Sequence, residues 1–220
     1  MGVITISRQF GSGGQEIAAR VCRQLGYAYL DKLLMTQVAA EVGLSGSQVA
    51  EFSEEHAKTS SFLERLLLPG PPDVARVTLR APGESGPAAL TVKHLDQAHC
   101  ASLVQSAIHA AYQRGNVVIL GRGGQAMLQK MLGVLHVRVE APIGDRILRV
   151  QRRDGVGPEA ARERIIEHDH ASAGYLKRLF GIRWDDAMLY HLVINTGKWE
   201  LDEAAGMIVH AVGQLKAKSA

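Results

Sequence analysis

The chain has 220 residues, of which 46% are hydrophobic and 21% are charged, and its formal net charge is +3. This length and apolar content suit one domain with a sizeable core and exclude wholesale disorder. Aromatic residues make up 5% and the cysteines number two, which leaves little material for a stacking platform on single-stranded nucleic acid or for a disulfide framework.

The first predicted element is a buried strand at Val3–Ile6, a short β-branched run. Met1 and Gly2 lack the basic start of a signal peptide, and no segment reaches the roughly 18 apolar residues that span a bilayer. We therefore expect a cytoplasmic protein that binds no membrane and no nucleic acid.

A glycine-rich segment, Gly11–Gly14, follows this strand and precedes an amphipathic helical pattern. The apolar positions of that helix are Ile17, Ala18, Val21, Cys22 and Leu25. In a strand–loop–helix unit of this kind, converging backbone N–H groups and the helix N-terminus cradle phosphate. The dinucleotide pattern G-x-G-x-x-G would need glycine at Glu16, which disfavours a Rossmann site, although Asp31 lies near where a ribose-binding acid would fall.

The P-loop pattern G-x-x-x-x-G-K-[ST] fits the same loop only at its second glycine, Gly13. Arg8 takes the place of the first glycine, Gly14 that of the lysine and Gln15 that of the Ser/Thr. From this segment alone, a tight strand-to-helix turn that binds nothing remains the alternative.

Further along, the apolar run Tyr27–Leu30 leads to Asp31, which is also a good N-cap for a helix at Leu33–Val42. The stretch from Pro69 to Leu95 then holds five of the seven prolines. We interpret it as a Pro/Gly-rich excursion at about 69–95, too short to bury a core of its own.

The second half alternates predicted strands with predicted helices. The strands are Val117–Leu120, Val134–Val139 and Leu192–Ile194; the helices include one around Leu103–Ala111, one from Pro158 to about Leu179 and one at Leu201–Leu215. This alternation predicts an α/β fold, a mostly parallel sheet with helices on both faces.

Several segments, in this order and spacing, resemble the cytidylate kinase-like family, whose members are P-loop relatives of the nucleoside monophosphate kinases. These segments are Ile6–Ala18, Leu25–Lys32, Val118–Gly123, Ala141–Arg153, Asp169–Trp184 and Leu192–Gly197. The resemblance covers most of the chain except Pro69 to Leu95. It implies a single P-loop-type three-layer sandwich over residues 1–220, with a helical acceptor-binding region and a lid-like segment at about 150–185.

The same resemblance implies an ATP-dependent phosphotransferase that uses Mg²⁺ and passes the γ-phosphoryl group to a nucleotide, with a cytidine nucleotide as the suggested acceptor. The donor phosphates would be held by Gly11–Gly14, with the Ser12 hydroxyl and Gln15. Arg8 at the loop mouth would add a cation, or else be a solvated surface arginine. Asp31 would hydrogen-bond the acceptor, cap a helix, or both.

Two groups of basic residues complete the predicted site. Arg122 follows a strand between two glycines, where ligands bind in such sheets, and its planar fork suits the acceptor phosphate or base. Arg149 and Arg153 share a helix face with Arg146; such a face is usually solvated, but here it would close on the transferring group. The range from Arg138 to Arg183 contains ten basic and seven acidic residues. Its net charge of +3 equals the formal net charge of the whole chain.

Two departures from the family concern catalytic charge. Gln15 stands where an arginine commonly follows the double glycine. Ser172 stands where the lid carries an arginine, for which Lys177, Arg178 and Arg183 are candidate substitutes. A nucleotide-binding regulator with little turnover is therefore an alternative, and so is a kinase of another small acceptor. His168 and His170 point to different helix faces, so no metal site is predicted on the protein itself.

Overall fold

The computed structural model describes residues 2–30 and 97–218. Its centre is one parallel sheet with strand order β2-β3-β1-β4-β5. The strands are β1 (Val3–Arg8), β2 (Ala28–Tyr29), β3 (Val117–Leu120), β4 (Val134–Glu140) and β5 (Leu192–Asn195). The four strands predicted from β-branched runs are confirmed, and the two-residue edge strand β2 is an addition.

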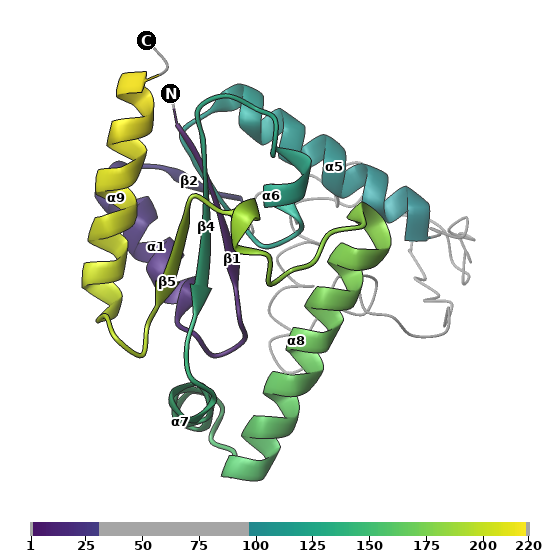
Figure 1. Ribbon diagram of the computed structural model, residues 1–220, viewed down its shortest axis with the longest axis vertical. Helices are drawn as coiled ribbons and strands as arrows, with labels where there is room; N and C mark the ends of the chain where they lie inside the picture. The colour runs from purple at the N-terminus through teal and green to yellow at the C-terminus, as the bar shows by residue number, and fades with distance from the viewer. Residues whose placement is uncertain (1, 31–96, 219–220) are drawn as a thin grey trace, which may run out of the picture.

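Helices cover both faces of the sheet, which confirms the predicted three-layer α/β fold (Figure 1). On one face, α1 (Gly14–Leu25) and α9 (Leu201–Lys218) bury Ile17 and Ile208 against Ile4 of β1. On the other face, α5 (Gln97–Arg114) and the four-residue α6 (Gly124–Met127) lie over a second cluster that includes Ile108 and Ile119. The sheet is therefore buried on both sides, as its nearly continuous apolar strands require.

One row of buried polar residues interrupts these apolar strands. Thr5 lies beside His136, and Ser7 beside Arg138, in the β1–β4 register. All four are buried, at 4% exposure or less. The hydrophobic pattern predicted the strands but gave no sign of this polar row, whose partners come from a loop much later in the chain.

Two further helices follow β4 on the side of the carboxyl ends of the strands. The arginine-rich helix is α7 (Ile143–Asp154), and the longer α8 (Pro158–Phe180) begins at Pro158 as predicted. They pack together through Val150, Ala161 and Ile165. Figure 1 shows α8 running from α7 toward α6, and a short 3₁₀ helix, η1 (Ala187–Leu189), leads on to β5.

Some predicted features fall outside the described residues: Asp31, the helix at 33–42 and the excursion at about 69–95. Within residues 2–30 and 97–218, no helix combines the length and apolarity needed to cross a bilayer.

Candidate functional site

A cavity of about 370 Å³ opens at the carboxyl ends of β1 and β3. The connection after β1 leads to α1 on one face of the sheet, whereas the connection after β3 leads to α6 on the other. The chain therefore diverges between these two strands, and such a switch point is where open α/β sheets bind ligands.

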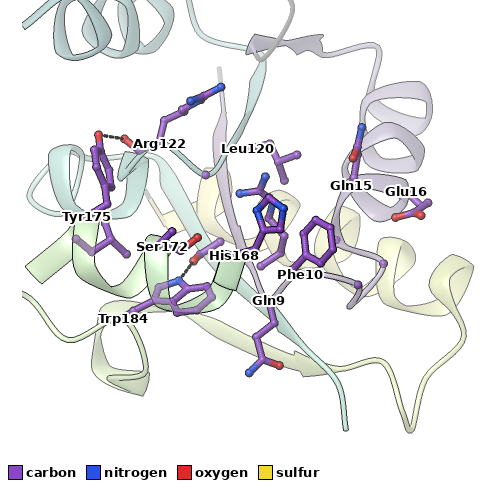
Figure 2. Close-up of a pocket in the computed structure, with 18 of the residues that line it drawn as sticks. Gln9, Phe10, Gln15, Glu16, Leu120, Arg122, His168, Ser172, Tyr175 and Trp184 are labelled. Carbon is purple, nitrogen blue, oxygen red and sulfur yellow. Dashed lines mark hydrogen bonds between the residues drawn. The ribbon is translucent and has the colours of Figure 1, made fainter. Parts of the chain in front are cut away.

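The cavity has two walls, which we name by their construction. The strand-end wall consists of the loop Arg8–Gly14 and the turn Gly121–Gly123. The helical wall consists of the lining residues of α7 and α8, which are Arg149, Val150, Arg153, His168, Ala171, Ser172, Tyr175 and Leu176. Figure 2 shows Gln15 and Glu16 at the α1 side of the cavity and Tyr175 with Arg122 at the opposite side.

Two glycines of the loop are required by its geometry. Gly11 and Gly13 have φ of +77° and +81°, in the left-handed region. A Cβ on Gly11 would lie 2.9 Å from the Val150 side chain, and one on Gly13 would lie 2.6 Å from Leu201. The loop delivers the chain to Gly14, the first residue of α1, so the positive end of that helix faces the cavity.

The hydroxyl of Ser12 does not face the cavity. It donates to the Gln9 carbonyl at 2.8 Å, and the side chain is fully buried. The Ser12 carbonyl accepts a hydrogen bond from Thr196 at 2.7 Å. The structure therefore gives Ser12 a role in shaping the loop, and this differs from the phosphate contact that we expected of its hydroxyl.

The turn after β3 is unusual because three successive residues are left-handed. Gly121, Arg122 and Gly123 have φ of +70°, +59° and +74°. A left-handed arginine costs about 1–2 kcal/mol, and Tyr175 helps to hold it by donating from its hydroxyl to the Arg122 carbonyl at 3.4 Å. Burial raises the pKa of the Tyr175 hydroxyl, while the Arg122 charge opposes this increase, so the hydroxyl keeps the proton that it donates. Phe180 closes over the turn, 2.6 Å from where a Cβ on Gly123 would be.

The predicted lid arginines are placed at the helical wall, but they already have protein partners. Arg149 donates to the Thr196 hydroxyl at 3.0 Å and to the Thr196 carbonyl at 2.7 Å. Arg153 donates to Asp154 at 2.7 Å. Both arginines line the cavity, whereas Lys177 is exposed and does not line it.

Sequence reasoning missed an aromatic stack at the centre of the site. The ring of Phe10 lies parallel to that of His168, with centroids 4.1 Å apart, and the Arg153 guanidinium lies 4.7 Å from the Phe10 centroid. Figure 2 shows the two stacked rings projecting into the cavity from the loop and from α8. Sequence reasoning considered His168 only as a metal ligand, because nothing local links it to a residue of the glycine loop.

A partly buried ion pair joins α7 to α8, and its carboxylate also holds the same loop. Arg146 of α7 and Asp169 of α8 lie 2.5 Å apart, with side-chain exposures of 9% and 18%. Asp169 also accepts from the backbone N–H of Phe10 at 2.9 Å. Arg146, the third member of the predicted arginine face, is therefore a structural residue that fixes the loop against the helical wall.

The floor of the cavity is formed by Trp184. Its indole N–H donates to the Ser7 hydroxyl at 2.7 Å, and its carbonyl accepts from Arg138 at 2.7 Å and from Tyr190 at 2.9 Å. The Arg138 guanidinium also lies 4.7 Å from the centroid of the Trp184 ring. The buried polar row of β1 and β4 thus fixes the loop after α8 beneath the cavity.

Charge in the cavity is strongly positive. The lining includes Arg8, Arg122, Arg149 and Arg153, and Glu16 is its one acidic residue within the described part of the chain. In that same part, no group of three or more His, Cys, Asp or Glu could hold a metal ion by itself. The residues suit Mg²⁺ that arrives bound to nucleotide phosphates, since Mg²⁺ keeps few protein ligands at such sites.

Comparisons with known proteins agree with this geometry. The model of the cytidylate kinase-like family matches residues 3–198. A cytidylate kinase of Thermococcus sibiricus is 28% identical over 97% of this chain and 89% of its own length. One of Methanocaldococcus jannaschii is 31% identical over 97% of this chain and 99% of its own. An uncharacterized protein from Eubacterium ventriosum, of solved structure, shares the fold at a TM-score of 0.63 and 16% identity, with 97% and 99% of the two chains covered.

Proposed function

Because the chain belongs to the cytidylate kinase-like family, we propose that it moves the γ-phosphoryl group of ATP to a nucleoside monophosphate, with a cytidine nucleotide as the first candidate. The observation that carries this proposal is the glycine loop at the N-terminus of α1, facing a cavity lined by four arginines and one acidic residue. Such a cavity stabilises polyanions and disfavours cationic or apolar ligands.

In this proposal the donor phosphates lie on Gly11, Gly13 and Gly14, and Gln15 adds an uncharged hydrogen-bond donor. An oxygen of the acceptor phosphate forms a bond to the γ-phosphorus, and the bond from that phosphorus to the β–γ bridging oxygen breaks. ADP leaves with the electron pair, and no proton needs to move because the acceptor phosphate is already an anion. When bound with the nucleotide, Mg²⁺ would neutralise part of the phosphate charge.

The acceptor is proposed to lie on the Arg122 side of the cavity. Arg122 is held in a strained turn, as residues at ligand sites often are, and its guanidinium suits a phosphate. Gln125 is 1% exposed beside it, and its Oε1 has no hydrogen-bond partner among the described residues. A buried amide of this kind is suited to hydrogen-bond a nucleobase. Asp31 is proposed as a further acceptor contact on the ground of the family resemblance alone.

The test is an assay of ADP release with ATP·Mg²⁺ and a panel of nucleoside monophosphates. We expect turnover with a cytidine nucleotide and a loss of at least about tenfold in kcat/KM in Arg122→Ala, since the removed contact is charge-assisted. Arg162→Ala is the matched control because Arg162 is exposed on α8 and outside the cavity lining. Equal loss in both variants would contradict the proposed acceptor site.

A nucleotide-binding regulator is the second candidate. Gln15 and Ser172 both line the cavity, and both are uncharged where the family resemblance implies arginine. Nucleotide binding by the wild type with no turnover on any acceptor would favour this alternative.

A further inference from the structure

The glycine at position 14 is required by a neighbouring side chain and not by its own backbone. Gly14 begins helix α1 and lies outside the left-handed region. A Cβ on Gly14 would nevertheless lie 2.5 Å from the Arg8 Cβ and 2.9 Å from its Cγ. Such distances are too short for any side chain at position 14 while Arg8 remains where it is.

The far end of Arg8 lies against a second glycine. A Cβ on Gly121 would lie 2.5 Å from Nη1 of Arg8 and 3.4 Å from its Cζ. The Gly121 N–H donates to the Ile6 carbonyl at 2.8 Å, so the turn after β3 is held against β1. The Arg8 side chain therefore starts above Gly14 and ends against Gly121, along the strand-end wall of the cavity.

From this path we infer that Arg8 supplies the loop cation that a P-loop takes from its lysine. In the P-loop pattern, glycine stands at position 8 and lysine at position 14. Here the two residue types are exchanged, and the structure shows that they exclude each other: a side chain at position 8 occupies the space of a side chain at position 14. Arg8 and Gly14, which each depart from the P-loop pattern, thus represent one change. In it the cation moves from the start of the helix to the end of the strand.

The exchange also changes the chemistry of the cation. An ammonium group is a point charge, whereas a guanidinium is planar and can donate to two phosphate oxygens at once. Arg8 would contact the β- and γ-phosphates from the strand side, opposite the N-terminus of α1. This assignment rests on the proposed binding of ATP at the loop, and it gives that site a catalytic charge that Gln15 does not provide.

A stability cycle tests the steric part without any ligand. We expect Gly14→Ala to lower Tm by roughly 5 °C in the wild-type background, since overpacking is destabilising. In an Arg8→Gly background the same Gly14→Ala change should lower Tm by less than about 1 °C or raise it. An equal decrease in both backgrounds would overturn the inference.

The catalytic part is tested by exchanging the two residues. Arg8→Gly should lower kcat/KM by about 100-fold or more, the usual cost of one transition-state donor, with Tm within a few degrees of the wild type. Gly14→Lys alone should also lose activity because the new side chain meets Arg8. The double variant Arg8→Gly/Gly14→Lys should exceed both single variants by at least tenfold, and Arg8→Lys should retain more activity than Arg8→Gly. Arg23→Ala, an exposed cation later on α1, is the control.

The outcomes separate this inference from the proposed function. If Arg8→Gly keeps kcat/KM within threefold of the wild type, Arg8 is not the loop cation even though the enzyme is a kinase. If the wild type shows no turnover, the role of Arg8 is still decided by titration with ATP and, separately, with adenosine. If Arg8→Gly loses affinity for ATP but not for adenosine, the inference is supported while the proposed function fails. Absence of ATP binding by the wild type would overturn both.

Discussion

The strand-end wall and the helical wall of the cavity differ in what they are made of. The strand-end wall carries the side chains of Arg8, Phe10 and Arg122, but glycines set its shape. Gly11, Gly13, Gly121 and Gly123 are all left-handed, and side chains added at these positions would meet neighbours. The helical wall is made of side chains, and its two arginines donate to groups of the protein itself. The shape of the first wall therefore depends on its glycines, and that of the second depends on how its side chains are paired.

The two walls should therefore be sensitive to different kinds of substitution. A substitution in the strand-end wall should change the shape offered to a ligand and affect turnover more than folding. A substitution in the helical wall should remove a partner from a buried charge and affect folding first.

The largest effect is expected from Asp169→Ala on α8, where the side chain supports the helical wall without lining the cavity. The change leaves Arg146 buried without its carboxylate and removes the acceptor of the Phe10 N–H. Breaking a buried ion pair on one side costs about 3–5 kcal/mol, so urea unfolding should show a decrease of that size in the free energy of unfolding. Glu163→Ala, at an exposed position of the same helix, should change it by less than about 0.5 kcal/mol. Similar values for the two variants would show that the ion pair does not hold α8.

The next effect is expected from Gly13→Ala in the strand-end wall. The alanine would keep a left-handed backbone, and its methyl group would lie 2.6 Å from a methyl group of Leu201. Relief of the backbone strain and of this clash would shift the loop. Displacements of about 1 Å at a site can cost around 100-fold, so kcat/KM should decrease by about that factor while the free energy of unfolding falls by only about 1–2 kcal/mol.

Gly174→Ala is the matched control, because a Cβ on this α8 residue has no neighbour within 4 Å. It should leave activity unchanged and stabilise the helix by about 0.5–1 kcal/mol. An equal loss of activity in both glycine variants would show that the strand-end wall tolerates side chains.

Acid should weaken the sheet beneath the cavity before it weakens either wall. Burial, together with a smaller effect of the neighbouring His191, lowers the pKa of His136 from 6.5 to about 4. Below pH 6.5 the unfolded chain takes up a proton that the folded chain does not, so stability is lost as pH falls from 6.5 toward 4. At pH 5 the loss relative to pH 7.5 should reach about 2 kcal/mol.

The measurement is urea unfolding at these two pH values. His136→Gln should be less stable than the wild type at pH 7.5, because Thr5 loses its buried partner, yet its stability should change less with pH. His170→Gln, at an exposed position, should keep the wild-type dependence. If His136→Gln keeps that dependence as well, the titrating group lies elsewhere.

The two walls also differ in how far the sequence predicted them. The strand-end wall is local in the chain: the order strand, glycines, helix predicted both the loop and its place, and Arg122 was found in the same way between Gly121 and Gly123. Four of the five strands followed from the same kind of local pattern, whereas the edge strand β2 and the buried polar row did not.

The helical wall is built from contacts between distant residues, so the sequence predicted less of it. Periodicity placed Arg146, Arg149 and Arg153 on one helix face, but it could not show that Arg146 pairs with Asp169 or that Phe10 stacks on His168. Amphipathic spacing indicates which way a side chain points and carries no information about what it meets.

The smallest effect is expected where the two walls are joined, at Thr196. Its hydroxyl accepts from Arg149 of the helical wall and donates to the Ser12 carbonyl of the strand-end wall. Thr196→Val keeps the shape and removes both bonds, although Arg149 still reaches the Thr196 carbonyl. The Ser12 carbonyl would then be buried without this donor, a loss of about 1 kcal/mol in the free energy of unfolding.

Kinetics of Thr196→Val decide whether Arg149 acts through the loop. If it does, KM for ATP should rise about threefold to fivefold, the equivalent of about 1 kcal/mol, while kcat stays near the wild-type value. Thr196→Ser retains the hydroxyl and should restore both constants. A decrease in kcat with an unchanged KM would instead place Arg149 on the transferring phosphoryl group, which would make the helical wall catalytic as well as structural.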